Sequence, residues 1–199
     1  FISAQIKSPQ PSPTATITQK VGVSNISVEY SRPGAKGRKI FGSLVSYGKM
    51  WRTGANKATK ITFNENCVFG GAKVKKGSYS LFTIPGEKEW TVVLNKNTEL
   101  WGAGEYDEKN QVCSIVAKAI ETKDFTESFT IDFGTFQSFS ATMSLKWANT
   151  KIDIKIESLA AEKLEKQYLE LLTKGPSAND YYNGAKFYAD NTTENEMSL

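Results

Sequence analysis

The sequence predicts a mainly β protein, an antiparallel β-sandwich of jelly-roll-like type followed by an antiparallel pair of helices. Short alternating runs of apolar and polar residues, rich in β-branched and aromatic side chains, recur from residue 14 to residue 157. Such runs are typical of half-buried strands. Glycine and proline turn signals separate them, and no helix long enough for a parallel crossover lies between them. After Glu157 the apolar spacing becomes helical.

The expected strands lie close together along the chain. Gly70-Gly71 and Pro85-Gly86 mark turns between them. The last two strands are expected to form a hairpin through residues 148–150. We expect strands at 14–19, 24–30, 58–64, 67–69, 78–84, 90–95, 112–120, 128–133, 139–147 and 151–156.

Residues 31–57 interrupt this pattern. They hold five glycines, interleaved with the aromatic residues Phe41, Tyr47 and Trp51, which predicts a long, well-packed loop. Long loops in compact domains are often functional. Leu81 and Phe82 point to opposite faces of their strand, so we expect one in the sandwich core and the other under this loop, and we do not expect these two and Trp90 to be buried alike.

Apolar residues recur at helical spacing within 158–174 and again within 177–188. Gly175-Pro176 separates the two segments and favours a helical hairpin. The pair is expected to pack through four side chains, Leu164, Tyr168, Leu171 and Tyr181.

The first residues predict export. Phe1–Gln5 resembles the end of a signal peptide, and Ile6–Pro13 is a proline- and serine-rich linker. We therefore expect a leader remnant and linker at 1–13, a β-sandwich domain at 14–157 and a helical tail at 158–199, in a protein of the periplasm or cell envelope. No stretch approaches the ~20 apolar residues of a membrane span, so no transmembrane segment is expected.

Composition narrows the chemistry. The chain has no histidine, which removes the usual general base and the usual zinc ligand. Cys67 and Cys113 lie in apolar runs, where a thiol acts as a small hydrophobic group, and whether they form a disulfide is left open. No phosphate loop, nucleophile motif or metal-ligand spacing is present. We predict no cofactor, no metal and no catalytic residue.

Positive charge is concentrated in one segment. Residues 31–60 contain eight basic residues and no acidic ones, although the formal net charge of the chain is only +4. This local charge argues against nucleic acid as a partner. All three arginines, Arg32, Arg38 and Arg52, lie in this segment, while lysines occur throughout. Guanidinium groups suit bidentate contacts with carboxylates or phosphates and stacking on aromatic rings.

Several sequence blocks together resemble the bacterial envelope family catalogued as domain of unknown function 2911, from about residue 9 to 156. The resemblance implies an exported β-rich domain and no established activity. It also leads us to expect Leu-Arg where this chain has Cys113-Ser114. The blocks are Tyr30-Ser31-Arg32-Pro33, Gly37–Gly42, Trp51–Thr59, Gly77–Pro85, Trp90, Leu94-Asn95 and Trp101-Gly102.

The main hypothesis is a binding module for a carboxylate, a phosphate or an acidic sugar, or for an envelope protein. In the alternative interpretation, each arginine pairs with a protein acid such as Glu29 or Asp132 and only anchors the loop. We expect at least two arginines to lie close together and to share a polar cluster with Asn56. The candidate ligand-binding residues are Arg32, Arg38, Arg52, Asn56, Trp51 and Trp101.

Two other functions stay open. A hydrolase acting on an envelope or carbohydrate substrate would need paired carboxylates, and Glu105, Asp107 and Glu108 are the candidates in the 97–109 loop. An assembly protein would use the helical tail as its partner surface, because aromatic residues are enriched in interface cores. The aromatic residues of the tail include Tyr168, Tyr181, Tyr182, Phe187 and Tyr188.

Overall fold

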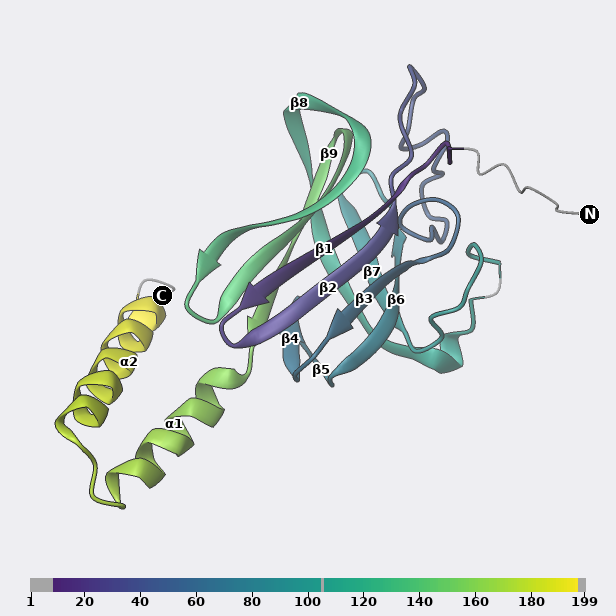
Figure 1. Cartoon of the computed structure of the whole chain (residues 1–199). Coiled ribbons are helices and arrows are strands. Elements are labelled where there is room, and N and C mark those ends of the chain that lie inside the picture. Colours follow the sequence, from purple (N-terminus) through teal and green to yellow (C-terminus); the bar gives the residue numbers. More distant parts are fainter. Residues whose placement is uncertain (1–8, 105, 197–199) are drawn as a thin grey trace, which may run out of the picture.

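The computed structural model describes residues 9–104 and 106–196 (Figure 1). The expected leader remnant and the first part of the linker, residues 1–8, lie outside the described residues. Two helices, α1 (Ala160–Leu172) and α2 (Ala178–Glu196), follow the strands. The strands are β1 (Thr14–Val21), β2 (Ser24–Ser31), β3 (Thr59–Phe63), β4 (Cys67–Phe69), β5 (Ala72–Val74), β6 (Gly77–Ile84), β7 (Glu89–Asn95), β8 (Gln111–Gln137) and β9 (Ser140–Ser158).

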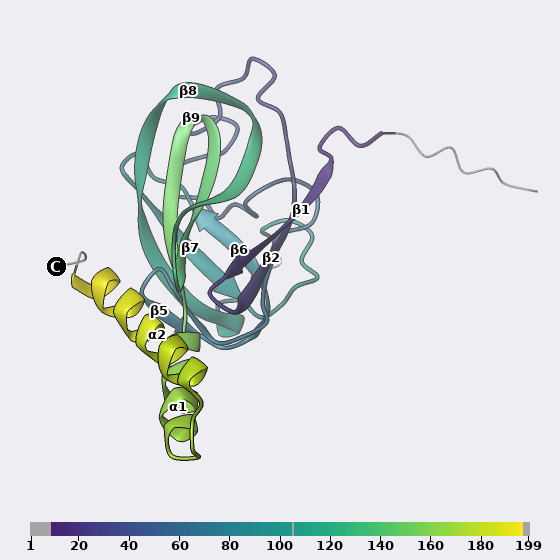
Figure 2. The ribbon, with the colours of Figure 1, turned by 60° about the vertical axis from the view of Figure 1, so that its left-hand side comes forward.

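The nine strands form one open antiparallel sheet in the order β1-β2-β3-β6-β7-β8-β9-β4-β5. The first part of β8 pairs with β7, and the rest of β8 pairs with β9. Both of these long strands curve strongly (Figure 2). The predicted mainly β, antiparallel fold with two C-terminal helices is confirmed, while its jelly-roll-like detail stays a prediction.

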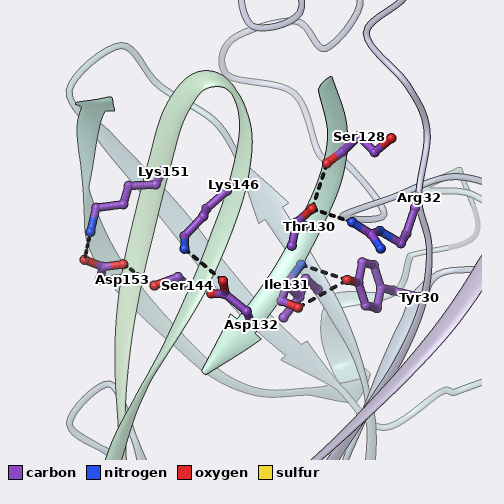
Figure 3. Close-up of polar contacts among 10 residues, drawn as sticks. All are labelled: Tyr30, Arg32, Ser128, Thr130, Ile131, Asp132, Ser144, Lys146, Lys151 and Asp153. Atoms are coloured by element: carbon purple, nitrogen blue, oxygen red, sulfur yellow. Dashed lines mark hydrogen bonds and ion pairs between the residues drawn. The ribbon is translucent and has the colours of Figure 1, made fainter. Parts of the chain in front are cut away.

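Hydrogen bonds between β2 and β8 show that the sheet folds back on itself (Figure 3). The Tyr30 hydroxyl donates to the Ile131 carbonyl at 3.2 Å and accepts from the Ile131 amide at 3.0 Å. Arg32 donates from Nε to the Phe129 carbonyl at 3.1 Å and from Nη2 to Thr130 Oγ1 at 2.7 Å. Since β2 and β8 are not neighbours in the strand order, these contacts hold two layers together around a core.

The hairpin expected through residues 148–150 is wrong. The strands expected at 112–120 and 128–133 form the single strand β8, and those at 139–147 and 151–156 form β9. The chain reverses at residues 138–139, next to the Gln137–Ser140 pair. Residues 148–150 lie inside β9, where Ala148 has a φ of +50°. This left-handed residue and the register shifts between Glu121 and Thr130 change the strand direction without ending the strand.

Large aromatic side chains fill the space between the layers. Trp51 from the long loop stacks on Trp147 of β9, with ring centroids 5.8 Å apart. Phe41 from the same loop lies 4.7 Å from Trp90 of β7 in an edge-on contact. The 31–57 loop is therefore part of the core, which explains why a loop of this length is ordered without strands of its own.

Leu81 and Phe82 of β6 are both fully buried, on opposite faces. Leu81 joins the main core, as expected for one of the two. Phe82 packs chiefly with Leu100, Val93 and Tyr106, with its ring centroid 5.4 Å from that of Tyr106. The 96–107 loop therefore covers most of this face. The prediction that the 31–57 loop covers this face is wrong. From that loop Met50 packs here, whereas its aromatic residues enter the main core instead. Trp90 is buried too, so the expected difference in burial is also wrong.

The two helices form a hairpin at the end of the β-domain away from the 31–57 loop (Figures 1 and 2). Leu164, Tyr168 and Leu171 of α1 are half-buried as expected. Tyr181 is exposed and does not form the expected contact. Phe187 takes this role, with its ring 5.2 Å from that of Tyr168. Neither described helix combines the length and the apolarity that crossing a membrane requires.

Cys67 and Cys113 are free thiols, and we expect Cys67 to be inert in the folded protein. Burial raises the pKa of the Cys67 thiol to about 12, with a smaller contribution from Cys113, so about one molecule in 10⁴ carries the thiolate at pH 8. A chromogenic disulfide reagent should react with Cys67 only after addition of urea. A Cys113→Ser variant isolates the signal, and fast labelling of its native form would contradict the prediction.

Candidate functional site

A pocket of about 490 Å³ opens beside the 31–57 loop. We call it the arginine pocket. Four segments that are distant in sequence meet there: the chain around Ser12, the long loop, Ala103 of the 96–107 loop, and Trp147 of β9. Its lining residues are Ser12, Pro33, Arg38, Leu44, Val45, Ser46, Lys49, Met50, Trp51, Arg52, Gly54, Ala55, Ala103 and Trp147.

Backbone contacts hold Trp51 and Arg52 at this position. Trp51 and Thr83 of β6 exchange two backbone hydrogen bonds of 2.7 and 2.9 Å. The Trp51 indole donates to the Gly54 carbonyl at 3.0 Å, and the Arg52 carbonyl accepts from the Thr59 amide at 3.2 Å. Because this backbone is bonded to β6 on one side and to β3 on the other, the Arg52 side chain extends from a fixed position.

The Arg52 guanidinium is the least satisfied polar group of the pocket. Its Nε is buried and has no hydrogen-bond partner among the described residues. Its Nη1 lies close to Gly102, where a Cβ would come within 3.3 Å of it. A guanidinium stays charged at any physiological pH, and a partly buried charge without a partner is costly. An anion in the pocket would offset this charge.

Arg38 and Lys49 add positive charge at the rim. Arg38 donates from Nε to the Ala35 carbonyl at 2.9 Å and from Nη2 to the Gly34 carbonyl at 2.7 Å. These two bonds orient its side chain and leave Nη1 uncommitted among the described residues. Lys49 is exposed and brings an ammonium group to the same lining.

The acid partners of the alternative interpretation pair with lysines instead. Glu29 lies 3.7 Å from Lys60. Asp132 lies 2.9 Å from Lys146, as Figure 3 shows. Within the part of the chain that the structure describes, every ion pair has a lysine as its cation, and the lining of the arginine pocket contains no acidic residue. The pocket therefore carries positive charge that the described residues do not neutralise.

The predicted site residues separate into three places. Arg38, Arg52 and Trp51 line the arginine pocket, so two arginines do lie together as expected. Arg32 is away from them and binds β8 through Phe129 and Thr130. Asn56 and Trp101 line a second pocket of about 370 Å³, which we call the Trp101 pocket.

The expected sharing of a polar cluster between Asn56 and the arginines is wrong. The Asn56 amide donates to the Ser12 carbonyl and to Ser31 Oγ, each at 3.2 Å. Asn56 has a φ of +59°, and its side chain bonds to the N-terminal segment and to the end of β2. Its role in the fold is to hold that segment against β2.

Sequence reasoning missed three contributors to the arginine pocket. Lys49 belongs to the segment without acidic residues, so its positive charge could have been used to predict it as a site residue. Trp147 lies on β9, almost a hundred residues from Arg52, and no local pattern connects the two. The backbone of Gly102 lies close to the Arg52 guanidinium. The Trp101-Gly102 motif does not by itself reveal this contact.

Of the carboxylates considered for catalysis, Glu105 lies outside the described residues. Asp107 Oδ1 accepts a hydrogen bond from the Lys109 amide at 3.0 Å and thereby begins the short 3-10 helix Glu108–Asn110. Glu108 is exposed. Among residues 9–104 and 106–196, no group of three or more acidic or cysteine side chains is arranged to hold a metal ion.

Residues 12–156 match the model of a family described as "Protein of unknown function (DUF2911)". The chain belongs to the DUF2911 family. No curated protein and no solved structure matches the chain.

The match to the DUF2911 family covers the β-domain and ends at Ile156, before α1. Every residue that lines the arginine pocket lies within it, whereas the helical hairpin lies outside. Ser114, where the family resemblance predicts an arginine, is exposed on β8 and lines neither pocket. Serine at this position therefore leaves the charge of both pockets unchanged.

Proposed function

We propose that this DUF2911 protein is a binding module that holds a small organic anion in the arginine pocket. The observation that supports this most directly is the Arg52 guanidinium, partly buried and without an acidic or hydrogen-bond partner among the described residues. In a lining with Arg38 and Lys49 and without an acid, an anionic group gains charge-assisted hydrogen bonds that the protein itself leaves unmade.

The volume and the lining of the arginine pocket favour an anion that carries an organic group. At about 490 Å³ the pocket lies within the usual 300–1,000 Å³ range of ligand sites and is much larger than an inorganic phosphate requires. Leu44, Val45 and Met50 supply apolar surface beside the cations. A carboxylate or phosphate would be held by the planar fork of Arg52, and the carbon skeleton would contact the apolar wall.

Isothermal titration with glucuronate, citrate and glycerol 3-phosphate tests the proposal. We expect at least one of them to bind, and Arg52→Gln to weaken that binding at least about tenfold, the factor that 1.4 kcal/mol represents. Binding should also weaken with added salt. Lys39→Gln is the matched control, because it removes one charge from the same loop at an exposed residue outside the lining.

Arg52→Lys separates binding from a purely structural role. Lysine keeps the charge and loses the bidentate fork, so the melting temperature should stay nearly unchanged while the affinity falls. A large loss of melting temperature in Arg52→Lys, with no anion bound by the original protein, would refute the proposal.

A further inference from the structure

The Trp101 pocket combines a flat aromatic face with neutral hydrogen-bonding groups. Trp101 is 64% exposed, whereas Trp51, Trp90 and Trp147 are buried. Exposed tryptophans without a partner are uncommon, because the indole has a large apolar surface. The other lining residues are Gln10, Thr14, Glu29, Tyr30, Ser31, Asn56, Lys57 and Ala58.

The charges of this second pocket are already paired. Lys57 Nζ lies 3.2 Å from Glu99, and Glu29 lies 3.7 Å from Lys60. Hydroxyl and amide groups of Thr14, Ser31 and Gln10 complete the wall. An exposed indole beside hydroxyls, amides and a carboxylate suits a neutral sugar ring, whose C–H face packs on the aromatic ring while its hydroxyls bond to the rim.

The two pockets adjoin. Three separate segments each contribute neighbouring residues to both: 10–14, 54–56 and 101–103. Along each of these segments, one or two residues of backbone, about 3.8 Å each, separate a residue that lines one pocket from a residue that lines the other. Gly102 stands between Trp101 and Ala103 in the third segment, and a Cβ on it would come within 3.3 Å of Arg52 Nη1.

From this juxtaposition we infer that the ligand is an acidic saccharide of at least two rings. A uronate ring occupies the arginine pocket, with its carboxylate on Arg52, and a linked neutral ring stacks on Trp101. This inference rests on the proposed function, since the arginine pocket holds the acidic group. A simple organic phosphate or carboxylate would occupy the arginine pocket alone and leave Trp101 uncovered.

Two sugars test the inference on the full chain: glucuronate, and the disaccharide of glucuronate linked to glucose. The linked disaccharide should bind at least about tenfold tighter than glucuronate. Trp101→Ala should abolish that difference and leave glucuronate binding unchanged, whereas Arg52→Gln should weaken both acidic sugars. Because Trp101 is the exposed tryptophan, acrylamide quenching of the fluorescence should fall when the disaccharide binds and should stay unchanged with glucuronate.

The outcomes separate this inference from the proposed function. Tight binding of glycerol 3-phosphate or citrate, with no gain from the second sugar ring, would overturn the inference and leave the anion site in place. Absence of binding by every anion would overturn both. An equal loss of glucuronate and disaccharide binding in Trp101→Ala would also overturn the inference, because Trp101 would then act by shaping the arginine pocket.

Discussion

Trp147→Ala is expected to lower the free energy of unfolding by about 3–5 kcal/mol, the usual cost of removing a large aromatic side chain from a core. Trp147 is 2% exposed. Its ring stacks on Trp51 and makes edge-on contacts with Phe41 and Phe129. Its indole also donates to the Glu127 carbonyl at 3.1 Å. The substitution therefore leaves a cavity between the two layers, while the Glu127 carbonyl keeps its hydrogen bond from the Ala35 amide at 2.8 Å.

Urea unfolding followed by circular dichroism measures this loss, which corresponds to a decrease of roughly 10 °C in melting temperature for a chain of this size. Trp101→Ala is the matched control, since that indole is exposed and its removal should change stability by less than about 0.5 kcal/mol. Equal effects of the two substitutions would show that Trp147 does not hold the long loop onto β9. Ligand binding should weaken in Trp147→Ala, because this residue also lines the arginine pocket.

Gly54→Ala is expected to cost about 3 kcal/mol and to displace Arg52. Gly54 has a φ of +153°, and a Cβ there would lie 3.0 Å from the Ser31 carbonyl oxygen and 3.3 Å from Thr59 Oγ1. These neighbours belong to β2 and β3, so neither can move without disturbing the sheet. The Gly54 carbonyl also accepts from the Trp51 indole, and a shift of this turn would move the backbone that carries Arg52.

Gly37→Ala provides the comparison for this second prediction. Gly37 has a φ of +71° with open space around a built Cβ, so only the backbone strain of about 1–2 kcal/mol is expected. The difference between the two variants measures the steric contact with Ser31 and Thr59. Anion affinity should fall in Gly54→Ala and stay unchanged in Gly37→Ala. A Gly54→Ala protein as stable as Gly37→Ala would contradict this account.

Most strands follow directly from local alternation. In β2 the residues Ile26, Val28 and Tyr30 are buried, and the residues between them are less so, because a strand with one buried face must alternate. The joining of β8 and β9 escaped the same reasoning. Residues 121–127 are polar except for Phe125 and read as a break, yet the pairs Glu121–Thr150 and Thr126–Ala148 with β9 keep the strand continuous. Local sequence cannot report hydrogen bonds made with a partner strand.

The candidate site was predicted less completely. The concentration of three arginines in one acid-free segment indicated that geometry, and not charge alone, matters there. Two of them do line one pocket, but Arg32 bonds to the backbone of β8 and Asn56 to the N-terminal segment. Which arginine keeps free donors depends on what lies opposite each one, and those groups come from β8, the 96–107 loop and the residues before β1.

Local periodicity, turn residues and composition are enough to predict the mainly β class, the helical tail and the segment that carries the positive charge, and the sequence blocks that resemble the DUF2911 family are enough to predict the family. The folded structure was needed to show that Phe41 and Trp51 enter the core, that the 96–107 loop covers Phe82, and that two adjoining pockets share three segments. The physical reason is that burial and hydrogen-bond partners are set by residues far apart in the chain. The curved sheet brings Trp147 beside Trp51, and the backbone of Gly102 close to Arg52.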